Sequence, residues 1–177
     1  MHKIFLIDGH SQIFRMYYAF MRRPMVNSKG EDTSILFGFT KMLLELIAKE
    51  QPTHLAVAFD PPAKTFRHEA FPEYKANRSA APELVKAALE PLQEILAALN
   101  IPVVMMPGYE ADDVIGTLSH QADMQGIETY MMTPDKDYGQ LVTEHVRMYR
   151  PGVGKAEAQI LGPKEICEKW GIESPLQ

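Results

Sequence analysis

The sequence is poor in cysteine and in long apolar runs. Its single cysteine, Cys167, excludes an internal disulfide and fits a reducing compartment. No stretch approaches the ~20 apolar residues of a membrane span, and the first apolar run, 4–7, is too short for a signal peptide core. We therefore expect a cytoplasmic protein that does not contact a membrane.

Several sequence signatures are also missing. The six histidines show no metal-ligand spacing, and there is no Ser-His-Asp arrangement, P-loop or G-x-G-x-x-G motif. The net charge of -5 argues against a protein that binds nucleic acid through overall charge alone. It does not exclude a nuclease, because an acidic metal site adds negative charge locally while basic groups gather elsewhere.

What is present is the alternation of strands and helices that is typical of α/β proteins. Short apolar runs predict four buried strands, and residues 146–149 a short edge strand; the four are 3–8, 54–59, 101–106 and 127–133. Apolar residues at helical spacing predict five helices, at 11–21, 35–49, 82–99, 114–124 and 163–170. Pro91 is expected to kink the third helix. The order predicts a mostly parallel central sheet with helices on both faces.

Acidic side chains follow each of the four predicted buried strands. Because the carboxyl ends of parallel strands open on one edge of the sheet, we expect these carboxylates to converge there. Ionised carboxylates repel one another and favour divalent cations, and oxygen ligands without Cys or His suit Mg²⁺ or Mn²⁺. The predicted ligands are Asp8, Asp60, Glu110, Asp112, Asp113, Asp135 and Asp137.

Each of these acids has a simpler interpretation when it is taken alone. Glu110, Asp112 and Asp113 stand in the first turn of a helix, where carboxylates complement the helix dipole. Asp8 and Asp60 could be caps or turn residues, and Asp137 could cap a short helix. The recurrence at four strand ends favours a metal site, and two ions would form the usual clamp for phosphoryl transfer.

The segment 61–82 differs from the rest of the chain. Its apolar periodicity is lost, and four basic residues over 64–81 exceed two acids. Lys75 and Arg78 would share one face of a helix, where they could contact phosphate oxygens, and Tyr74 could stack on a base. Lys64 and Arg67 add to the positive charge. We expect 64–81 to be poorly held without nucleic acid, because few of its residues can be buried. A solvated basic loop is the alternative.

Five motifs together resemble the 5′-3′ exonuclease domain of bacterial DNA polymerase I, which is related to flap endonucleases and PIN-like domains. They are Asp8-Gly9, Phe59-Asp60-Pro61, Tyr74-Lys75-Ala-Asn-Arg78, Gly108-Tyr-Glu110-Ala-Asp112-Asp113 and Thr133-Pro-Asp135-Lys-Asp137. The likeness runs in order through residues 1–177. It implies a metal-dependent DNA nuclease that leaves a 5′-phosphate and a 3′-hydroxyl and acts in replication and repair.

The resemblance also implies individual roles. Asp8, Asp60, Glu110 and Asp112 would hold one ion, and the remaining acids would serve the other. Lys75 and Arg78 correspond to the catalytic basic pair of a helical arch formed by 61–82. Phe14 and Arg15 correspond to residues that meet the nucleotide beside the cut. DNA with 5′ flaps, nicks or RNA primers would be the substrate of a monomer continuous with a polymerase region.

The chain departs from the family at two places. A Gly-Asp-x-x-Asp-Asn motif and a helix-hairpin-helix DNA clamp would follow residue 177, so we expect a fragment without the clamp and without two acids of the second metal site. Tyr138-Gly139 stands where a large apolar residue is usual. Two rival functions remain, a PIN-type endoribonuclease and a non-enzymatic metal- or phosphate-binding α/β domain. The long basic segment argues against the first, and Gly9-His10 after Asp8, in place of an acid pair, argues against the second.

Overall fold

A mostly parallel sheet forms the centre of the protein. The computed structural model describes residues 2–77, 79–152 and 156–176. In this part of the chain the sheet has six strands in the order β3-β2-β1-β4-β5-β6, of which only β6 runs antiparallel to its neighbour. The strands are β1 (Lys3–Asp8), β2 (His54–Ala58), β3 (Val103–Val104), β4 (Glu128–Met132), β5 (Val146–Arg150) and β6 (Gln159–Leu161).

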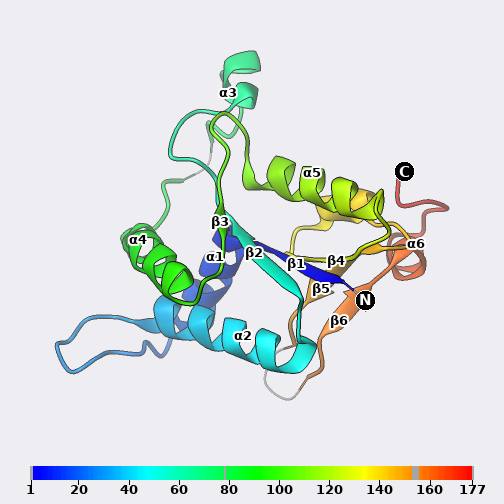
Figure 1. Cartoon of the computed structure of the whole chain (residues 1–177). Helices are drawn as coiled ribbons and strands as arrows, with labels where there is room; N and C mark the ends of the chain where they lie inside the picture. Colours follow the sequence, from blue (N-terminus) through cyan, green and yellow to red (C-terminus); the bar gives the residue numbers. More distant parts are fainter. Residues whose placement is uncertain (1, 78, 153–155, 177) are drawn as a thin grey trace.

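Helices cover both faces of this sheet (Figure 1). One face carries α1 (Gly9–Phe20), α2 (Ser34–Glu50) and α4 (Glu83–Ala98), and the other carries α5 (Ala111–Asp123), the 3₁₀ helix η1 (Lys136–Leu141) and α6 (Pro163–Trp170). The remaining short helix, α3 (Phe66–Ala70), lies in a segment that projects beyond the sheet. The expected fold class is therefore confirmed.

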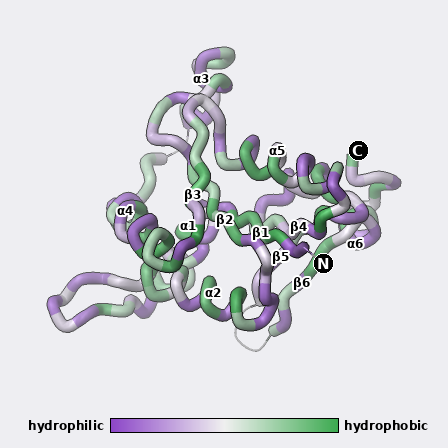
Figure 2. The backbone as a smooth tube through the Cα atoms, in the orientation of Figure 1, coloured by the Kyte–Doolittle hydropathy of each residue, from purple (hydrophilic) through white to green (hydrophobic). Residues whose placement is uncertain are grey.

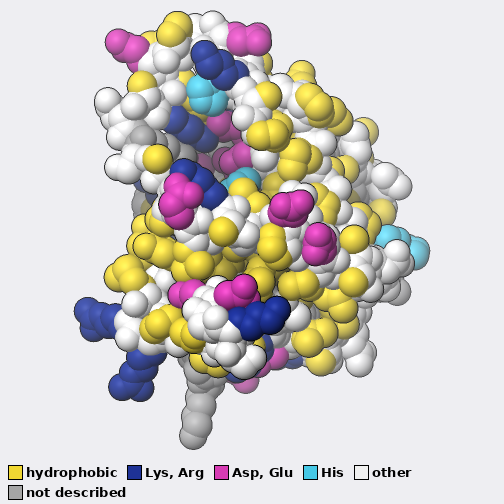
Figure 3. All heavy atoms as spheres, turned by 90° about the vertical axis from the view of Figure 1, so that its left-hand side faces the viewer, with side chains coloured by type: hydrophobic (Ala, Val, Ile, Leu, Met, Phe, Trp, Pro, Cys, Tyr) yellow, Lys and Arg dark blue, Asp and Glu magenta, His cyan; other side chains and the backbone are white. Residues whose placement is uncertain are grey.

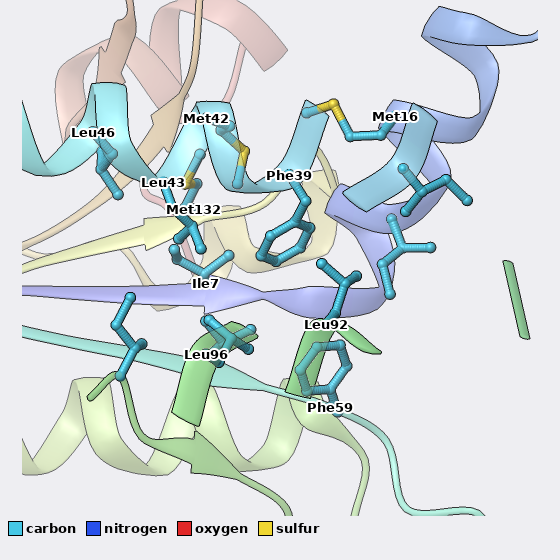
Figure 4. Packing of buried hydrophobic residues seen from close by; sticks show 14 of the residues in the cluster. Ile7, Met16, Phe39, Met42, Leu43, Leu46, Phe59, Leu92, Leu96 and Met132 are labelled. Atoms are coloured by element: carbon cyan, nitrogen blue, oxygen red, sulfur yellow. The ribbon is translucent and has the colours of Figure 1, made fainter. Parts of the chain in front are cut away.

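The alternation of side chains along the strands builds two separate cores. Phe5 and Ile7 of β1 pack with α1, α2 and α4, whereas Leu6 between them packs with α5 and α6 on the opposite face. Figure 4 shows side chains from β1, α2 and α4 meeting in the larger core. In Figure 2 hydrophilic residues prevail in the loop between α1 and α2, well away from this apolar centre.

The parallel register aligns the strand ends from which the acids emerge. Asp8 pairs with Ala58, two residues before Asp60, and Ile7 pairs with Met132, so that Asp8 lies beside Thr133. The loop after β3 leads into α5 with Glu110 as its N-cap. One edge of the sheet therefore receives all four acidic segments, as the strand order predicts.

Several elements differ from the expected ones. The third strand is two residues long instead of six. Helix α4 continues through Pro91, and the kink expected there stays a prediction. Strand β6 was not predicted, because a three-residue run carries no usable periodicity. In the described part of the chain no helix is both long and apolar enough to cross a lipid bilayer.

The junction between β1 and α1 depends on the absence of a side chain at Gly9. Three ring carbons of Phe59 lie within 2.7 Å of the position that a Cβ would occupy there. Phe59 is fully buried among α1, α4 and the sheet, so its ring has little room to move. Gly9 therefore lets α1 begin directly after Asp8.

We predict that Gly9→Ala lowers the free energy of unfolding by about 1–3 kcal/mol, because it overpacks a closed core. The matched control is Gly116→Ala in the middle of α5, where a Cβ would lie 3.5 Å from a Leu141 methyl carbon, an ordinary contact. That control should be neutral or stabilising by up to about 1 kcal/mol, since alanine favours a helix. Urea unfolding of both variants measures the difference, and equal stabilities would contradict the prediction.

Candidate metal and nucleic-acid site

Four carboxylates line one cavity at the carboxyl edge of the sheet. Its volume is about 610 Å³, and its acidic members come from β1, the loop after β2, α5 and the loop after β4. They are Asp8, Asp60, Asp112 and Asp135. Of the seven predicted acids at this edge, the structure thus brings four into one cavity.

Asp8 is held rigidly at the centre of this cavity. It caps α1 by accepting a hydrogen bond from the Ser11 backbone N–H at 3.1 Å, and it also accepts from the hydroxyls of Ser11 and Thr133. Only 5% of Asp8 is exposed, and this burial raises the pKa of its carboxyl group although the hydrogen bonds lower it. The nearby charge of Asp60 raises the pKa further.

Asp112 experiences the same crowding. Partial desolvation raises the pKa of its carboxyl group, and the charges of Asp8, Asp60 and Asp135 act in the same direction. The Tyr138 hydroxyl donates to Asp112 Oδ1 at 2.6 Å, which opposes this effect. In return, burial and the surrounding carboxylates raise the pKa of Tyr138, so this hydroxyl stays protonated and remains a donor.

Asp60 and Asp135 are fixed through backbone contacts. Asp60 Oδ1 accepts from the Ala111 N–H at 2.7 Å, which ties the end of β2 to the start of α5. His10 Nδ1 lies 3.7 Å from Asp60 Oδ2. Asp135 caps η1 by accepting from the Asp137 N–H at 3.0 Å. Both carboxylates are therefore oriented before any ligand arrives.

A second cavity adjoins the first and contains the other acids. Its volume is about 640 Å³, and Asp112 lines both cavities. The remaining acidic residues of its lining are Glu110, Asp113 and Asp137. Asp137 is exposed and lies in the first turn of η1, but the residue that caps this helix is Asp135, which accepts from the Asp137 N–H.

Basic and phenolic side chains of the segment 61–82 form hydrogen bonds with two carboxylates of this second cavity. Arg67 forms a bidentate pair with Asp113, at 2.6 and 2.7 Å, and lowers the pKa of that carboxyl group. Lys75 Nζ lies 2.7 Å from Glu110 Oε1, and the Tyr74 hydroxyl donates to Glu110 Oε2 at 3.0 Å. Figure 3 shows acidic and basic side chains gathered in a hollow beneath the projecting segment.

The expectation that 64–81 is poorly held is therefore wrong for its first part. Few of its residues are buried, as expected, and Thr65 is the exception in the described residues. Thr65 and His68 form a capping box that starts α3, and polar bonds to α5 replace the missing apolar contacts. Lys75 has a positive φ of 57°, a costly conformation for lysine that aims its side chain at Glu110.

The residues predicted to contact nucleic acid lie in different places. Phe14 and Arg15 line the first cavity together with Lys75, and Arg67 and Tyr74 line the second. Lys64 is exposed and lines neither cavity. Arg78 lies outside the described residues.

Sequence reasoning missed the hydroxyl groups that hold the acids. Ser11, Thr133 and Tyr138 each donate to a cavity carboxylate. Ser11 stands three residues after the capping Asp8, a spacing that could have indicated the contact. Tyr138 was noted only as a departure from the family, because its pairing with Asp112 depends on how η1 packs against α5.

The carboxylates suit divalent ions by their chemistry. In the described residues, however, no group of three or more Asp, Glu, His or Cys side chains is already arranged so that it could hold a metal ion. Two features support the fit. Burial and neighbouring carboxylates raise the pKa values of Asp8 and Asp112, and the donors are all oxygens, which is the preference of Mg²⁺ and Mn²⁺. Asp113 and Glu110 are paired with Arg67 and Lys75.

Comparison with known proteins gives consistent results. The family described as "5′-3′ exonuclease, N-terminal resolvase-like domain" matches residues 3–171. DNA polymerase I of Mycobacterium tuberculosis is 40% identical over 169 residues, which cover 96% of this chain and 19% of that protein. A 5′-3′ exonuclease of Aquifex aeolicus is 37% identical over 98% of this chain and 58% of its own length.

Among solved structures, a bacteriophage T5 flap endonuclease in a complex with DNA and metal ions has a TM-score of 0.66 at 17% identity. The match covers 98% of this chain and 62% of that one. This similarity supports the fold. The chain spans less than a fifth of the length of the M. tuberculosis polymerase.

We predict that Asp8→Asn stabilises the metal-free chain by on the order of 1 kcal/mol at about pH 7. Burial raises the pKa of Asp8 above its ordinary value of 3.8, so its ionisation opposes folding. The destabilisation by ionised Asp8 is absent below its ordinary pKa, grows as the pH rises toward the pKa of the folded state, and is complete above that pKa.

Urea unfolding in a chelating buffer at about pH 7 and about pH 3 measures this effect. Asp137→Asn, the same change on an exposed carboxylate, is the control and should alter stability little. A gain for Asp8→Asn that persists at low pH, or no gain at neutral pH, would show that the charge of Asp8 is not the cause.

Proposed function

Because the chain belongs to the 5′-3′ exonuclease N-terminal, resolvase-like family, we propose that it is the catalytic domain of a metal-dependent DNA nuclease. In this proposal residues 1–177 form one domain, and 61–82 form an arch-like basic segment over the site. The reaction is hydrolysis of a phosphodiester bond that leaves a 5′-phosphate and a 3′-hydroxyl.

The observation that carries the proposal is the crowding of Asp8, Asp60, Asp112 and Asp135 in one cavity. Burial raises the pKa values of Asp8 and Asp112, and the charges of the neighbouring carboxylates raise them further. A phosphodiester is itself an anion and would be repelled by this cavity unless cations were present. The arrangement is therefore suited to hold divalent cations and phosphate together, and it has no evident use for a neutral substrate.

Two ions, Mg²⁺ or Mn²⁺, are the proposed cofactors. Asp8, Asp60, Glu110 and Asp112 would hold one of them, and Asp113, Asp135 and Asp137 would hold or orient the other. When bound, such ions neutralise the phosphate charge and lower the pKa of water. Tyr138, Ser11 and Thr133 orient the carboxylates through hydrogen bonds.

The basic and aromatic side chains would position the substrate. Lys75 and Arg15 line the same cavity as the four acids, where a lysine or arginine can contact non-bridging phosphate oxygens. Phe14 lines it as well and offers an aromatic face to a base. Arg67 and Tyr74 border the second cavity beneath the arch-like segment, and Arg78 and Lys64 would add positive charge along the same segment.

DNA with 5′ flaps, nicks or RNA primers is the proposed substrate class, in keeping with the names of the polymerase and exonuclease relatives. In the full-length protein the domain would work beside a polymerase region and a DNA clamp, removing primers and flaps. The single cysteine supports a cytoplasmic location. We further propose that the domain acts as a monomer.

A PIN-type ribonuclease is the second candidate, since it would use a similar acidic pocket. The polar contacts that tie 61–82 to α5 favour the DNA nuclease, because they make the segment part of the site. Cleavage of a 5′-flap DNA and of a single-stranded RNA, compared at equal Mg²⁺ or Mn²⁺ concentration, separates the two. Preference for the RNA would overturn the proposal.

We predict that Asp112→Ala weakens Mn²⁺ binding at least roughly tenfold and slows flap cleavage by about 100-fold or more. Asp112 lines both cavities, so its loss affects every ion held there. Asp123→Ala, at the far end of the same helix, is the control and should keep both properties. Calorimetry and a labelled flap substrate provide the measurements. Unchanged Mn²⁺ affinity in Asp112→Ala would refute the metal assignment.

We predict opposite effects on binding and cleavage for Lys75→Ala. Lys75 neutralises Glu110 in the free chain, so its removal should tighten Mn²⁺ binding by roughly threefold or more while cleavage falls. Lys86→Ala, which removes an exposed lysine paired with Glu83 in α4, is the control. Weaker Mn²⁺ binding in Lys75→Ala would show that Lys75 supports the ion site instead of competing with it.

A further inference from the structure

A third cavity lies beside the acidic one and differs from it in charge. Its volume is about 390 Å³, within the range of sites that bind small ligands, and it lies at the ends of β4 and β5. Two arginines, Arg15 and Arg150, line it together with one exposed carboxylate, Glu157. Arg15 and Pro134 also line the acidic cavity, so the two spaces are neighbours.

The two arginines form no ion pair with a described residue. In contrast, Arg67 pairs with Glu110 and Asp113, and Arg147 pairs with Glu128. Arg15 donates to the carbonyl oxygens of Pro151 and Gly152, at 3.1 and 3.3 Å, and burial lowers its pKa. Two cations thus line one cavity, and Glu157, the carboxylate described in its lining, forms no ion pair with either of them.

Arg150 has unused hydrogen-bonding capacity. Its Nη2 donates to the Pro134 carbonyl at 3.3 Å, whereas its Nε is buried and has no acceptor among the described residues. A buried guanidinium N–H without a partner is costly, and natural proteins keep few of them. A planar guanidinium with free N–H groups is matched in geometry by a phosphate, which can accept two parallel hydrogen bonds after a small rotation of the side chain.

The backbone beside the cavity fixes Arg15. The Pro151 and Gly152 carbonyl groups accept its hydrogen bonds. A Cβ at Gly152 would collide with the Ala156 carbonyl oxygen, so the close approach of these two residues requires glycine. The end of β5 and α1 therefore hold both guanidinium groups in position beside Thr133, whose hydroxyl donates to Asp8.

We propose that this cavity, with Arg150 as its principal residue, binds a phosphate of the cut DNA strand next to the one being hydrolysed. The inference rests on the proposed nuclease function and extends it to a site on the far side of Arg15 from the acids. Arg150 and Arg15 together grip the neighbouring phosphate. The strand is thereby held in register while the acidic cavity acts on the adjacent bond.

The first experiment tests phosphate binding without any nuclease activity. The probe is inorganic phosphate, titrated into the isotope-labelled chain while the arginine Nε–Hε signals are followed by NMR. The signals of Arg150 and Arg15 should shift together and saturate. Arg147 lies in β5, like Arg150, and pairs with Glu128 of β4 at 3.3 Å. Its signal should stay unchanged.

The second experiment uses flap DNA and matched variants. Arg150→Gln should raise KM three- to tenfold with kcat unchanged, and it should reduce the slope of log affinity against log salt by about 0.9, the loss of one phosphate contact. Arg147→Gln removes the same charge from the same strand and should match the parent chain. Thermal unfolding checks that both variants fold.

The outcomes are distinguishable. If Arg150→Gln behaves as the parent chain while the parent still cleaves flaps, the phosphate site is wrong and the nuclease function stands. If phosphate shifts Arg150 but Arg150→Gln leaves the salt slope intact, the cavity binds free phosphate, and its assignment to DNA is overturned. If phosphate shifts Arg150 and the parent chain cleaves no nucleic acid, the phosphate site stands and the nuclease function fails.

Discussion

Electrostatic repulsion among carboxylates at one edge of the sheet is the constraint on which the rest of the structure depends. Parallel strands bring Asp8, Asp60 and Asp135 to the same edge by register alone, and α5 adds Asp112. Apolar packing on both faces of the sheet must offset the resulting strain, because the hydrogen bonds that Asp8 and Asp112 accept oppose the effects of burial and repulsion only in part. The buried cores above and below β1 therefore hold together a site that the acids by themselves would push apart.

The free chain relieves part of this repulsion with its own cations. Arg67 neutralises Asp113 and Lys75 neutralises Glu110, and both come from the projecting segment and not from the sheet. The same groups are the ones suited to contact a substrate phosphate. Under the proposed function, binding of ions and DNA would be an exchange of partners: the carboxylates would give up arginine and lysine for divalent cations, and the released side chains would turn to phosphate. An exchange of this kind couples the position of the segment to the state of the site.

The sequence predicted the sheet class and most of the acids, because buried parallel strands are short apolar runs and each run here ends near a carboxylate. It could not predict that the acids divide between two cavities, since that depends on how the first turn of α5 is oriented. It also failed for the segment 61–82, where α3 begins with a capping box and Arg67 and Lys75 form ion pairs with residues 46 and 35 positions away. Strand β6 was missed, and a short helix at η1 was considered only as an alternative role for Asp137, because such short elements owe their conformation to neighbours and not to their own periodicity.

A protein with a net charge of -5 can bind a polyanion only if its charges are arranged spatially, and the structure supplies such an arrangement. Lys75 and Arg15 line the acidic cavity, and Arg15 also lines the neighbouring cavity together with Arg150. Under the proposed function, a strand that crosses the sheet edge would meet positive charge beside the acids, and the acids only where divalent ions are bound. Such a sequence of charges favours one position of the strand over its neighbours, because a shift by one nucleotide would set a phosphate against an uncompensated carboxylate or leave an arginine without its anion. The arrangement of charge can therefore set where the bond is cut without any contact to the identity of a base.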